Sequence, residues 1–169
     1  MKSVFIGDVQ TGAHDGAEVV LKGWVKRTRG NNNLRFVVLR DSTGTIQCVI
    51  KRSEVGDDAF AALSEALIES SMELKGTVKV DERADGGHEL SVSDGHVVGG
   101  VDPARPFPIT ESAMAAADGG ETEFLLDHRH LYLRTSRMTT MLQIRSTAFG
   151  AIHGYFRDLD FVEYQAPNF

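Results

Sequence analysis

Two short strand-like runs joined by a polar turn constrain this chain more than any other stretch. Residues 34–40 (LRFVVLR) and 45–51 (TIQCVIK) alternate apolar and polar positions on either side of Asp41–Gly44. Side chains along a strand point alternately to opposite faces, so each run has one face for a core and another for solvent or a ligand. The expected core face consists of Val37, Leu39, Ile46, Cys48 and Ile50.

The opposite face of the same runs carries an aromatic ring, an amide and cations. Phe36 and Arg40 lie on it in the first run, and Gln47 and Lys51 in the second. An aromatic ring stacks on unpaired bases, an amide offers a donor and an acceptor, and cations meet phosphates. This face therefore indicates a surface for single-stranded nucleic acid.

Charge is distributed unevenly along the chain. The formal net charge is −6, yet residues 22–52 hold eight basic side chains against Asp41 alone, a local charge of +7 that leaves −13 elsewhere. A solvated strand surface would explain the charges alone. Their coincidence with Phe36 and Gln47 favours a basic face for a polyanion on an acidic body.

The composition excludes several classes of protein. Hydrophobic residues make up 41% of the 169 residues, enough for a packed core. No apolar run approaches the ~20 residues that span a bilayer, and the polar start does not suit a secretory signal. The single cysteine, Cys48, allows no internal disulfide or thiolate cluster, and the histidines lack metal-ligand spacing. We expect a soluble, cytoplasmic protein with no membrane partner and no cofactor or metal in this chain.

The order of the expected elements predicts a five-stranded barrel. Three strands, a helix and two more strands follow the order of the OB-fold, whose second and third strands bind oligonucleotides. We expect residues 1–104 to form this domain, with residues 1–16 as a lead-in that contains a short turn. The expected elements are strands at 19–26, 34–40 and 45–51, a helix at 57–68, and strands at 72–81 and 89–98.

Arg27 raises a question of strand phase. Strict alternation places it with Leu21 and Val25 on the core side, where an unpaired guanidinium is expensive. Either Arg27 lies beyond the barrel, or Gly23 introduces a β-bulge that resets the alternation.

The sequence changes character near residue 101. Residues 102–108 contain three prolines and suit neither a helix nor a central strand. Residues 112–122 could form a short helix or part of a linker. We expect a hinge or linker over residues 105–130.

A helix and a strand are expected at the C-terminal end. The apolar spacing of residues 131–158 predicts one long amphipathic helix, and residues 160–166 a strand that ends at Pro167. One helix and one strand cannot form an independent core, so residues 131–169 need a partner. The expected fold class is thus a β-barrel with an α-helical appendage.

Three pieces of sequence are distinctive in this order: GWVKRTRG with FVVLRDSTGTIQCVI, then FLLDHRHLYLR at 124–134, then the helix followed by FVEYQAP at 161–167. Together they resemble the aspartyl/asparaginyl branch of class II aminoacyl-tRNA synthetases. The first resembles its anticodon-binding OB domain, the second the entry into its catalytic domain, and the third class II motif 1. The wording RHLYLR and RDSTGTIQCVI resembles the asparaginyl members more closely, with an aspartate–tRNA ligase as the alternative.

The resemblance implies that the barrel binds the anticodon loop of an asparagine-type tRNA. It implies that Phe36 stacks on the middle anticodon base, that Gln47 reads base edges and that Glu89 contacts the first base. Arg27 would lie beside the anticodon, and Arg29 is a second candidate for that place.

The resemblance also implies properties of the complete enzyme, a homodimer that attaches asparagine to tRNA with ATP and Mg²⁺. Motifs 2 and 3, which bind ATP and the adenylate in this family, have no match here. We therefore expect no catalytic residue in this chain and no amino-acid activation by the chain alone. Motif 1 is the dimerisation element, which implies an interface with Phe149, Ile152, Phe156, Phe161 and Pro167.

Two further functions stay open. The chain could be a free-standing OB-fold protein that binds single-stranded nucleic acid without reading an anticodon. It could also be a regulatory subunit that dimerises with a full-length synthetase through residues 131–169.

Overall fold

The computed structural model describes residues 3–109 and 122–165. The chain divides into two compact units, residues 1–107 and residues 108–169. The three-part division expected at residues 104 and 130 stays a prediction.

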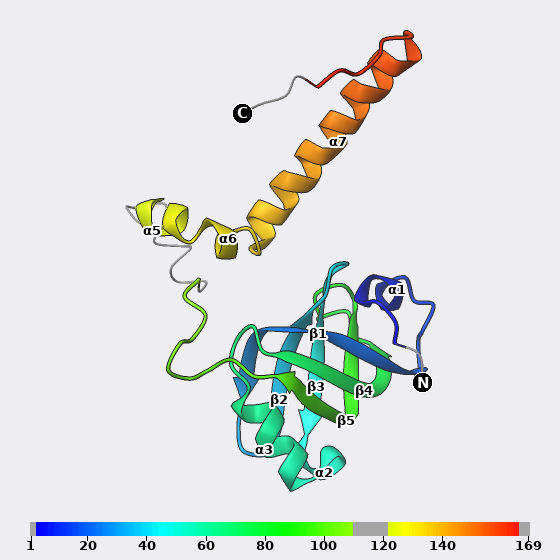
Figure 1. Cartoon of the computed structure of the whole chain (residues 1–169). Helices are drawn as coiled ribbons and strands as arrows, with labels where there is room; N and C mark the ends of the chain where they lie inside the picture. Colours follow the sequence, from blue (N-terminus) through cyan, green and yellow to red (C-terminus); the bar gives the residue numbers. More distant parts are fainter. Residues whose placement is uncertain (1–2, 110–121, 166–169) are drawn as a thin grey trace. The chain divides into compact units, whose positions relative to one another are not determined.

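The first unit is a closed barrel of five strands in the order β1-β2-β3-β5-β4 (Figure 1). β1 pairs antiparallel with both β2 and β4, and β3 pairs parallel with β5, which closes the barrel. This is the expected OB-fold, and closure leaves no sheet edge unpaired. The strands are β1 (Glu18–Gly30), β2 (Leu34–Arg40), β3 (Thr45–Lys51), β4 (Ser71–Val80) and β5 (His88–Gly99).

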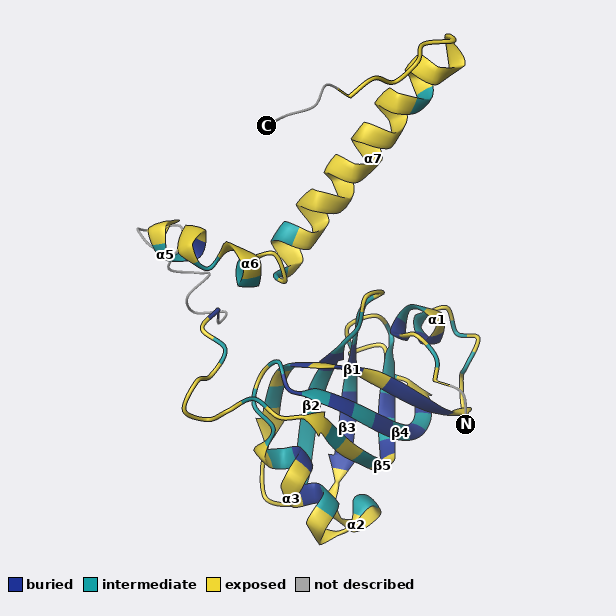
Figure 2. Ribbon diagram, viewed as in Figure 1, coloured by how far each residue is buried: buried dark blue, intermediate teal, exposed yellow. Residues whose placement is uncertain are grey.

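The barrel interior is filled by alternate side chains of every strand, seen as dark blue segments in Figure 2. Val37 and Leu39 are fully buried, whereas Phe36, Val38 and Arg40, which alternate with them, are only partly buried. The faces expected for β2 are therefore confirmed. Every residue expected on the core face of the β2–β3 hairpin is buried: Val37, Leu39, Ile46, Cys48 and Ile50.

β1 changes phase at a β-bulge between Val25 and Arg27. Of the two alternatives considered for Arg27, a bulge at Gly23 is wrong, because Gly23 pairs in regular register with Met72 of β4. Gly23 is instead buried where a Cβ would strike the carbonyl oxygen of Arg40. The bulge places Arg27 on the exposed side, so its guanidinium is not buried.

A helix that the sequence did not predict lies in the lead-in. α1 (Ile6–Gln10) buries its apolar side chains against the barrel. The Asp41 carboxylate accepts a hydrogen bond from the Ile6 N–H at 2.8 Å, and the Gln10 amide donates to a β3 carbonyl oxygen at 2.9 Å. Five residues are too few to show a helical period, so the sequence indicated only a short turn in residues 1–16.

Two short helices connect β3 to β4 at one end of the barrel (Figure 1). They are α2 (Arg52–Val55) and α3 (Asp57–Glu65), and Phe60 and Leu63 of α3 are buried in the barrel core. The helix expected to reach residue 68 ends at Glu65, because Ala66 is already extended.

The second unit contains three described helices: α5 (Thr122–Asp127), α6 (Arg129–Tyr132) and α7 (Ser136–Asp158). The single helix expected over 131–158 is interrupted before Ser136. Thr135 begins a new helix there, and its hydroxyl accepts from the Met138 N–H at 3.4 Å. Its polar side chain competes for backbone hydrogen bonds and so favours a helix start.

The strand expected at 160–166 does not form within the described part, which ends at residue 165. A strand needs a neighbour for its backbone hydrogen bonds, and the described residues of this unit supply no other strand. The segment instead folds back on the end of α7, where the Phe161 N–H bonds the Phe156 carbonyl oxygen at 3.1 Å. Residues 112–121 and Pro167, both named above, lie outside the described residues.

Most of α7 is exposed, as its yellow ribbon in Figure 2 shows. None of the helices in the two described ranges is long and apolar enough to cross a membrane.

Candidate nucleic-acid interface

Outward-facing residues of four neighbouring strands form a row across the barrel. Arg27 pairs with Val38, Val38 with Gln47, and Gln47 with Glu89. Paired residues share a face, so these side chains, named here the polar row, lie on one surface. The polar row contains three of the five site residues expected from the sequence.

A second row, the aromatic row, lies beside the polar row on the same face. Arg29 pairs with Phe36, Phe36 with Val49, and Val49 with Ser91. Val49 is almost fully buried, whereas Arg29 is exposed and Phe36 partly exposed. The aromatic row therefore presents the partly exposed ring of Phe36 beside the apolar side chain of Val49.

Side-chain contacts connect the two rows. The Arg29 guanidinium carbon lies 5.1 Å from the centroid of the Phe36 ring, a cation–π contact. Arg29 Nη2 donates to Gln47 Oε1 at 3.3 Å, and Gln47 Nε2 donates to Glu89 Oε2 at 3.5 Å. The structure thus brings four expected site residues into one connected group, with Arg27 exposed at the β1 end of the polar row.

Not every cation of residues 22–52 is available to a phosphate. Lys22 pairs with Glu73 at 2.8 Å, and this bond lowers the pKa of the Glu73 carboxyl. Arg40 donates to both carboxylate oxygens of Glu69 at 2.9 Å, with the two side chains only 20% and 9% exposed. Arg52 pairs with an aspartate of α3. Five cations make no ion pair within the described residues: Lys26, Arg27, Arg29, Arg35 and Lys51.

The loop between β1 and β2 is held in place by a residue that the sequence did not single out. The Arg52 N–H donates to the Asn33 carbonyl oxygen at 3.0 Å, and Arg52 Nη1 donates to that of Asn32 at 3.4 Å. Asn31 Oδ1 accepts from the N–H groups of Asn33 and Leu34. Residues 31–33 lie just before β2, which carries Phe36 of the aromatic row. Nothing in the sequence pattern indicates that this loop contacts Arg52.

The hairpin between β4 and β5 leads directly to Glu89. The Asp81 carboxylate accepts from the backbone N–H of Arg83 at 3.0 Å and from its Nε at 3.1 Å. These bonds lower the pKa of Asp81. The Asp81 N–H donates to the Gly87 carbonyl oxygen at 3.0 Å, which closes the hairpin.

The buried thiol of Cys48 faces the core, not the candidate site. Burial raises its pKa well above the usual range, so the thiol stays protonated. Within residues 3–109 and 122–165, no cluster of three or more His, Cys, Asp or Glu side chains could hold a metal ion.

The apolar residues expected at a dimer interface lie on and beside α7. Phe149, Ile152, Phe156 and Phe161 are each between 47% and 61% exposed. The rings of Phe156 and Phe161 meet edge to face, with centroids 5.5 Å apart.

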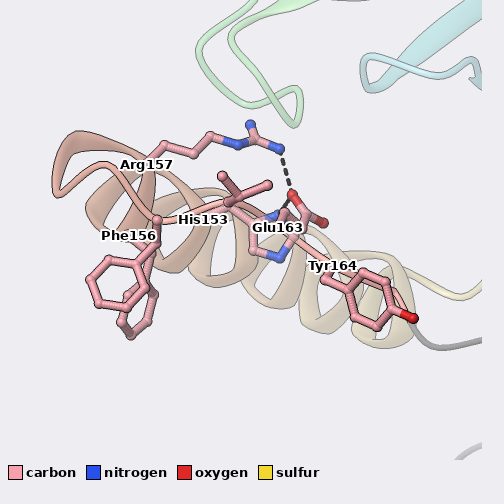
Figure 3. Close-up of a pocket in the computed structure, with 7 residues that line it drawn as sticks. His153, Phe156, Arg157, Glu163 and Tyr164 are labelled. Atoms are coloured by element: carbon pink, nitrogen blue, oxygen red, sulfur yellow. Dashed lines mark hydrogen bonds and ion pairs between the residues drawn. The ribbon is translucent and has the colours of Figure 1, made fainter.

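The end of α7 forms a small hollow with the segment that follows it (Figure 3). Arg157 Nη2 donates to Glu163 Oε2 at 2.6 Å, and His153 Nδ1 lies 3.6 Å from the same oxygen. The carboxylate of Glu163 thus holds the segment against the helix.

The comparisons with known proteins agree with this geometry. Residues 19–98 match the family model of the OB-fold nucleic acid binding domain, and the closed five-stranded barrel has this fold. The whole chain is similar to asparaginyl-tRNA synthetases, as the sequence predicted.

The similarity to these ligases extends along nearly the whole chain. An asparagine–tRNA ligase of Thermoplasma acidophilum is 41% identical over 162 residues, which is 96% of this chain and 35% of the ligase. One of Sorangium cellulosum is 38% identical over 93% of this chain and 33% of the ligase. The chain therefore spans about a third of the length of these relatives.

Solved structures show the same architecture. The asparaginyl-tRNA synthetase of Pyrococcus horikoshii complexed with asparaginyl-adenylate matches with a TM-score of 0.84 and 30% identity, over 99% of this chain and 37% of that one. A putative aspartyl-tRNA synthetase of Leishmania major matches with a TM-score of 0.86, over 98% of this chain and 34% of that one. At 21% identity, the second likeness shows the fold alone.

Proposed function

We propose that the barrel binds the anticodon loop of an asparagine-type tRNA, as part of an asparagine–tRNA ligase. The observation that carries the proposal is the group formed by Phe36, Arg29, Gln47 and Glu89 on the outer face of the barrel. The similarity to asparagine–tRNA ligases along 96% of the chain supports the same function.

Phe36 is the proposed stacking platform for the middle anticodon base. Its ring is partly exposed and rests beside the nearly buried Val49, so one surface can receive a base without loss of core packing. Stacking of a base on an aromatic side chain is typically worth ~1–3 kcal/mol.

Gln47 of the polar row is proposed to contact base edges, and the exposed cations are proposed to contact phosphates. The amide of Gln47 offers a donor and an acceptor. Arg27 and Lys51 are exposed and make no ion pair within the described residues, so they can neutralise phosphates. Direct contact between Glu89 and the first anticodon base stays a prediction from the family resemblance.

The chemistry proposed for the complete ligase is the ATP-dependent attachment of asparagine to this tRNA, in the cytoplasm. ATP and Mg²⁺ would supply the activation of the carboxyl group. The described residues contain no cluster that fits a metal ion, so no step of this activation is assigned to the described residues.

The proposed second partner is another copy of the same chain. The exposed Phe149, Ile152 and Phe156 of α7, with Phe161 packed against Phe156, provide an apolar surface for it. Burial of such side chains favours association.

A binding experiment with the full chain tests the anticodon proposal. We expect a stem-loop with the anticodon GUU to bind more tightly than the same stem with a scrambled loop, by fluorescence anisotropy at fixed salt. Equal binding would support the alternative of a free-standing OB-fold protein without anticodon reading. Tighter binding of a GUC loop would favour an aspartate–tRNA ligase.

A further inference from the structure

The barrel closes through one parallel pairing, that of β3 with β5, named here the seam. It runs only from the pair Gln47 and Glu89 to the pair Ile50 and Val92. Every other pairing in the barrel is antiparallel and longer. Parallel pairs are also slightly less stable per residue than antiparallel pairs. The seam is therefore the pairing at which the barrel opens most easily.

The two ends of the seam are covered by different segments. Because the strands are parallel, β3 and β5 both begin at the end where Gln47 meets Glu89. At the other end, α2 and α3 contact β5, and Phe60 and Leu63 of α3 pack in the core. Figure 1 shows α1 at the opposite end of the barrel from α2 and α3. The lead-in segment therefore covers the end that these two helices leave uncovered.

Residues 4–16, named here the strap, are bonded to the β2–β3 side of this end. The Ile6 N–H donates to Asp41 of the β2–β3 turn at 2.8 Å. Gln10 Nε2 donates at 2.9 Å to the carbonyl oxygen of Thr45, the first residue of β3. Both bonds hold the strap to the strand on one side of the seam.

The strap is also bonded to the β5 side. Asp15 Oδ1 lies 2.9 Å from Nε2 of His88, the first residue of β5. The Gln10 amide lies against Gly86 of the β4–β5 hairpin, where a Cβ would strike the amide nitrogen. The strap therefore spans the seam, with Gln10 in contact with both sides.

We propose that the strap holds the seam closed at the end where the polar row crosses it. Gln47 and Glu89 are the first pair of the seam, so opening from this end would separate them before any other pair. Such local opening can occur without unfolding of the whole barrel. Gln10 and Asp15 are thus positioning residues for the polar row, although neither belongs to it. The inference goes beyond the proposed function, because it concerns the free chain.

Amide hydrogen exchange in the ¹⁵N-labelled full chain, followed by NMR without nucleic acid, tests the inference. We expect Gln10→Ala to speed exchange of the amides that bond across the seam by ~2- to 12-fold, the change for one net hydrogen bond. The increase should be largest near Gln47 and Glu89 and should fade toward Ile50 and Val92, where α2 and α3 hold the seam. Amides that pair β1 with β2 should keep their rates.

Two further variants sharpen the measurement. Thr11→Ala is the matched control, because the Thr11 hydroxyl bonds only atoms of the strap among the described residues, and it should leave the seam unchanged. Asp15→Ala breaks the contact on the β5 side and should speed the same amides as Gln10→Ala. The Asp15 side chain is 46% exposed, so this variant should fold and can decide the question by itself.

Several outcomes would overturn the proposal. They are a uniform increase across the barrel, no increase in either bridging variant, or an equal increase in Thr11→Ala. The strap would then contribute only to global stability, or not at all.

Stem-loop binding provides a second readout. The closed form still predominates in Gln10→Ala, so its affinity for the GUU loop should stay within about twofold of that of the unmodified chain. A larger loss with unchanged exchange would place Gln10 in the RNA contact and contradict the inference. If the unmodified chain binds all loops equally, the proposed function is wrong, and the exchange rates still decide whether the strap holds the seam.

Discussion

Phe36 is the residue on which the proposed binding surface depends most. Val37, the next residue, and Leu39, two positions beyond Val37, are fully buried on the opposite face of β2. A slip of β2 by one residue would bury Phe36 and Arg40 and expose Val37 and Leu39. The cost of burying the guanidinium and exposing the aliphatic side chains therefore keeps the ring on the outer face.

Replacement of Phe36 by alanine should weaken binding of the anticodon stem-loop while leaving the fold intact. The expected loss is ~1–3 kcal/mol, the typical value for one base stacked on one aromatic ring. Anisotropy titrations measure the affinity, and thermal unfolding followed by circular dichroism monitors the fold. Val98→Ala, which truncates an exposed side chain of β5, provides a control. Unchanged binding by Phe36→Ala would show that the Phe36 ring is not part of the binding site.

Among the elements, β1 determines how the surface is assembled. Its first half pairs with β4 and its second half with β2, and the bulge between Val25 and Arg27 separates the two phases. Before the bulge Leu21 and Val25 fill the core, and after it Arg27 and Arg29 face outward. One strand thus serves the core and the binding surface in succession.

Replacement of Gly23 by alanine should destabilise the barrel. A Cβ at this position would strike the carbonyl oxygen of Arg40 and come within 3.0 Å of the Leu39 side chain, so the backbones of β1 and β2 would have to separate. Overpacking of this kind typically costs ~1–3 kcal/mol. Urea unfolding of the full chain measures the change. Gly100→Ala is the matched control, because no atom lies within 4 Å of its Cβ position.

The β4–β5 hairpin should become less stable in acid. Hydrogen bonds from Arg83 lower the pKa of Asp81, so the ionised carboxylate stabilises the hairpin. That contribution is complete above the ordinary aspartate pKa of about 3.9 and is lost as the pH falls through the lowered value. The backbone amide resonance of Arg83 should therefore move in strong acid. Asp81→Asn should abolish this titration, and a movement that persists in the variant would contradict the assignment.

For the molecule as a whole, the attraction of a polyanion depends on where the charges lie more than on the net charge. Three of the eight cations in residues 22–52 are neutralised by carboxylates from other parts of the chain, at Glu73, Glu69 and Asp57. The remaining five make no ion pair within the described residues, so five is an upper limit on the charges that a polyanion can meet. A polyanion therefore meets fewer positive charges than the sequence count suggests.

The salt dependence of binding should reflect these five cations. A single strand contributes a slope of about −0.7 in log K against log salt for each phosphate neutralised. We expect a slope of about −3.5 at most, compared with about −5.6 for all eight cations. Arg27→Ala should make the slope less steep by about 0.7, and Arg40→Ala should leave it unchanged because Glu69 neutralises Arg40. A slope near −5.6 would contradict this account.

Much of the barrel could be predicted because its signals are local. The alternation of residues 34–51 indicated the hairpin and both of its faces, and the order of elements indicated the OB-fold. α1 was missed because five residues show no period, and the bulge was misplaced because its cause lies in the pairing with β2. The strand expected at 160–166 was wrong within the described residues, where no neighbouring strand is present.

The site could be predicted only in part. Phe36 and Gln47 follow from strand parity, and the family resemblance named Arg27, Arg29 and Glu89. Their contacts could not be predicted, because Gln47 and Glu89 are 42 residues apart in the sequence and meet through the parallel pairing of β3 and β5. Likewise, the alternation of polar and apolar residues along a strand could not predict the ion pair of Arg40 with Glu69.

The parallel pairing of β3 and β5 has a thermodynamic consequence. Since this surface exists only when the barrel is closed, a nucleic acid that binds it has no comparable site on the unfolded chain. Binding and folding are then linked, and a ligand at 100 times its Kd would raise the free energy of unfolding by about 2.7 kcal/mol. An RNA loop that fits this surface therefore also protects the barrel against unfolding.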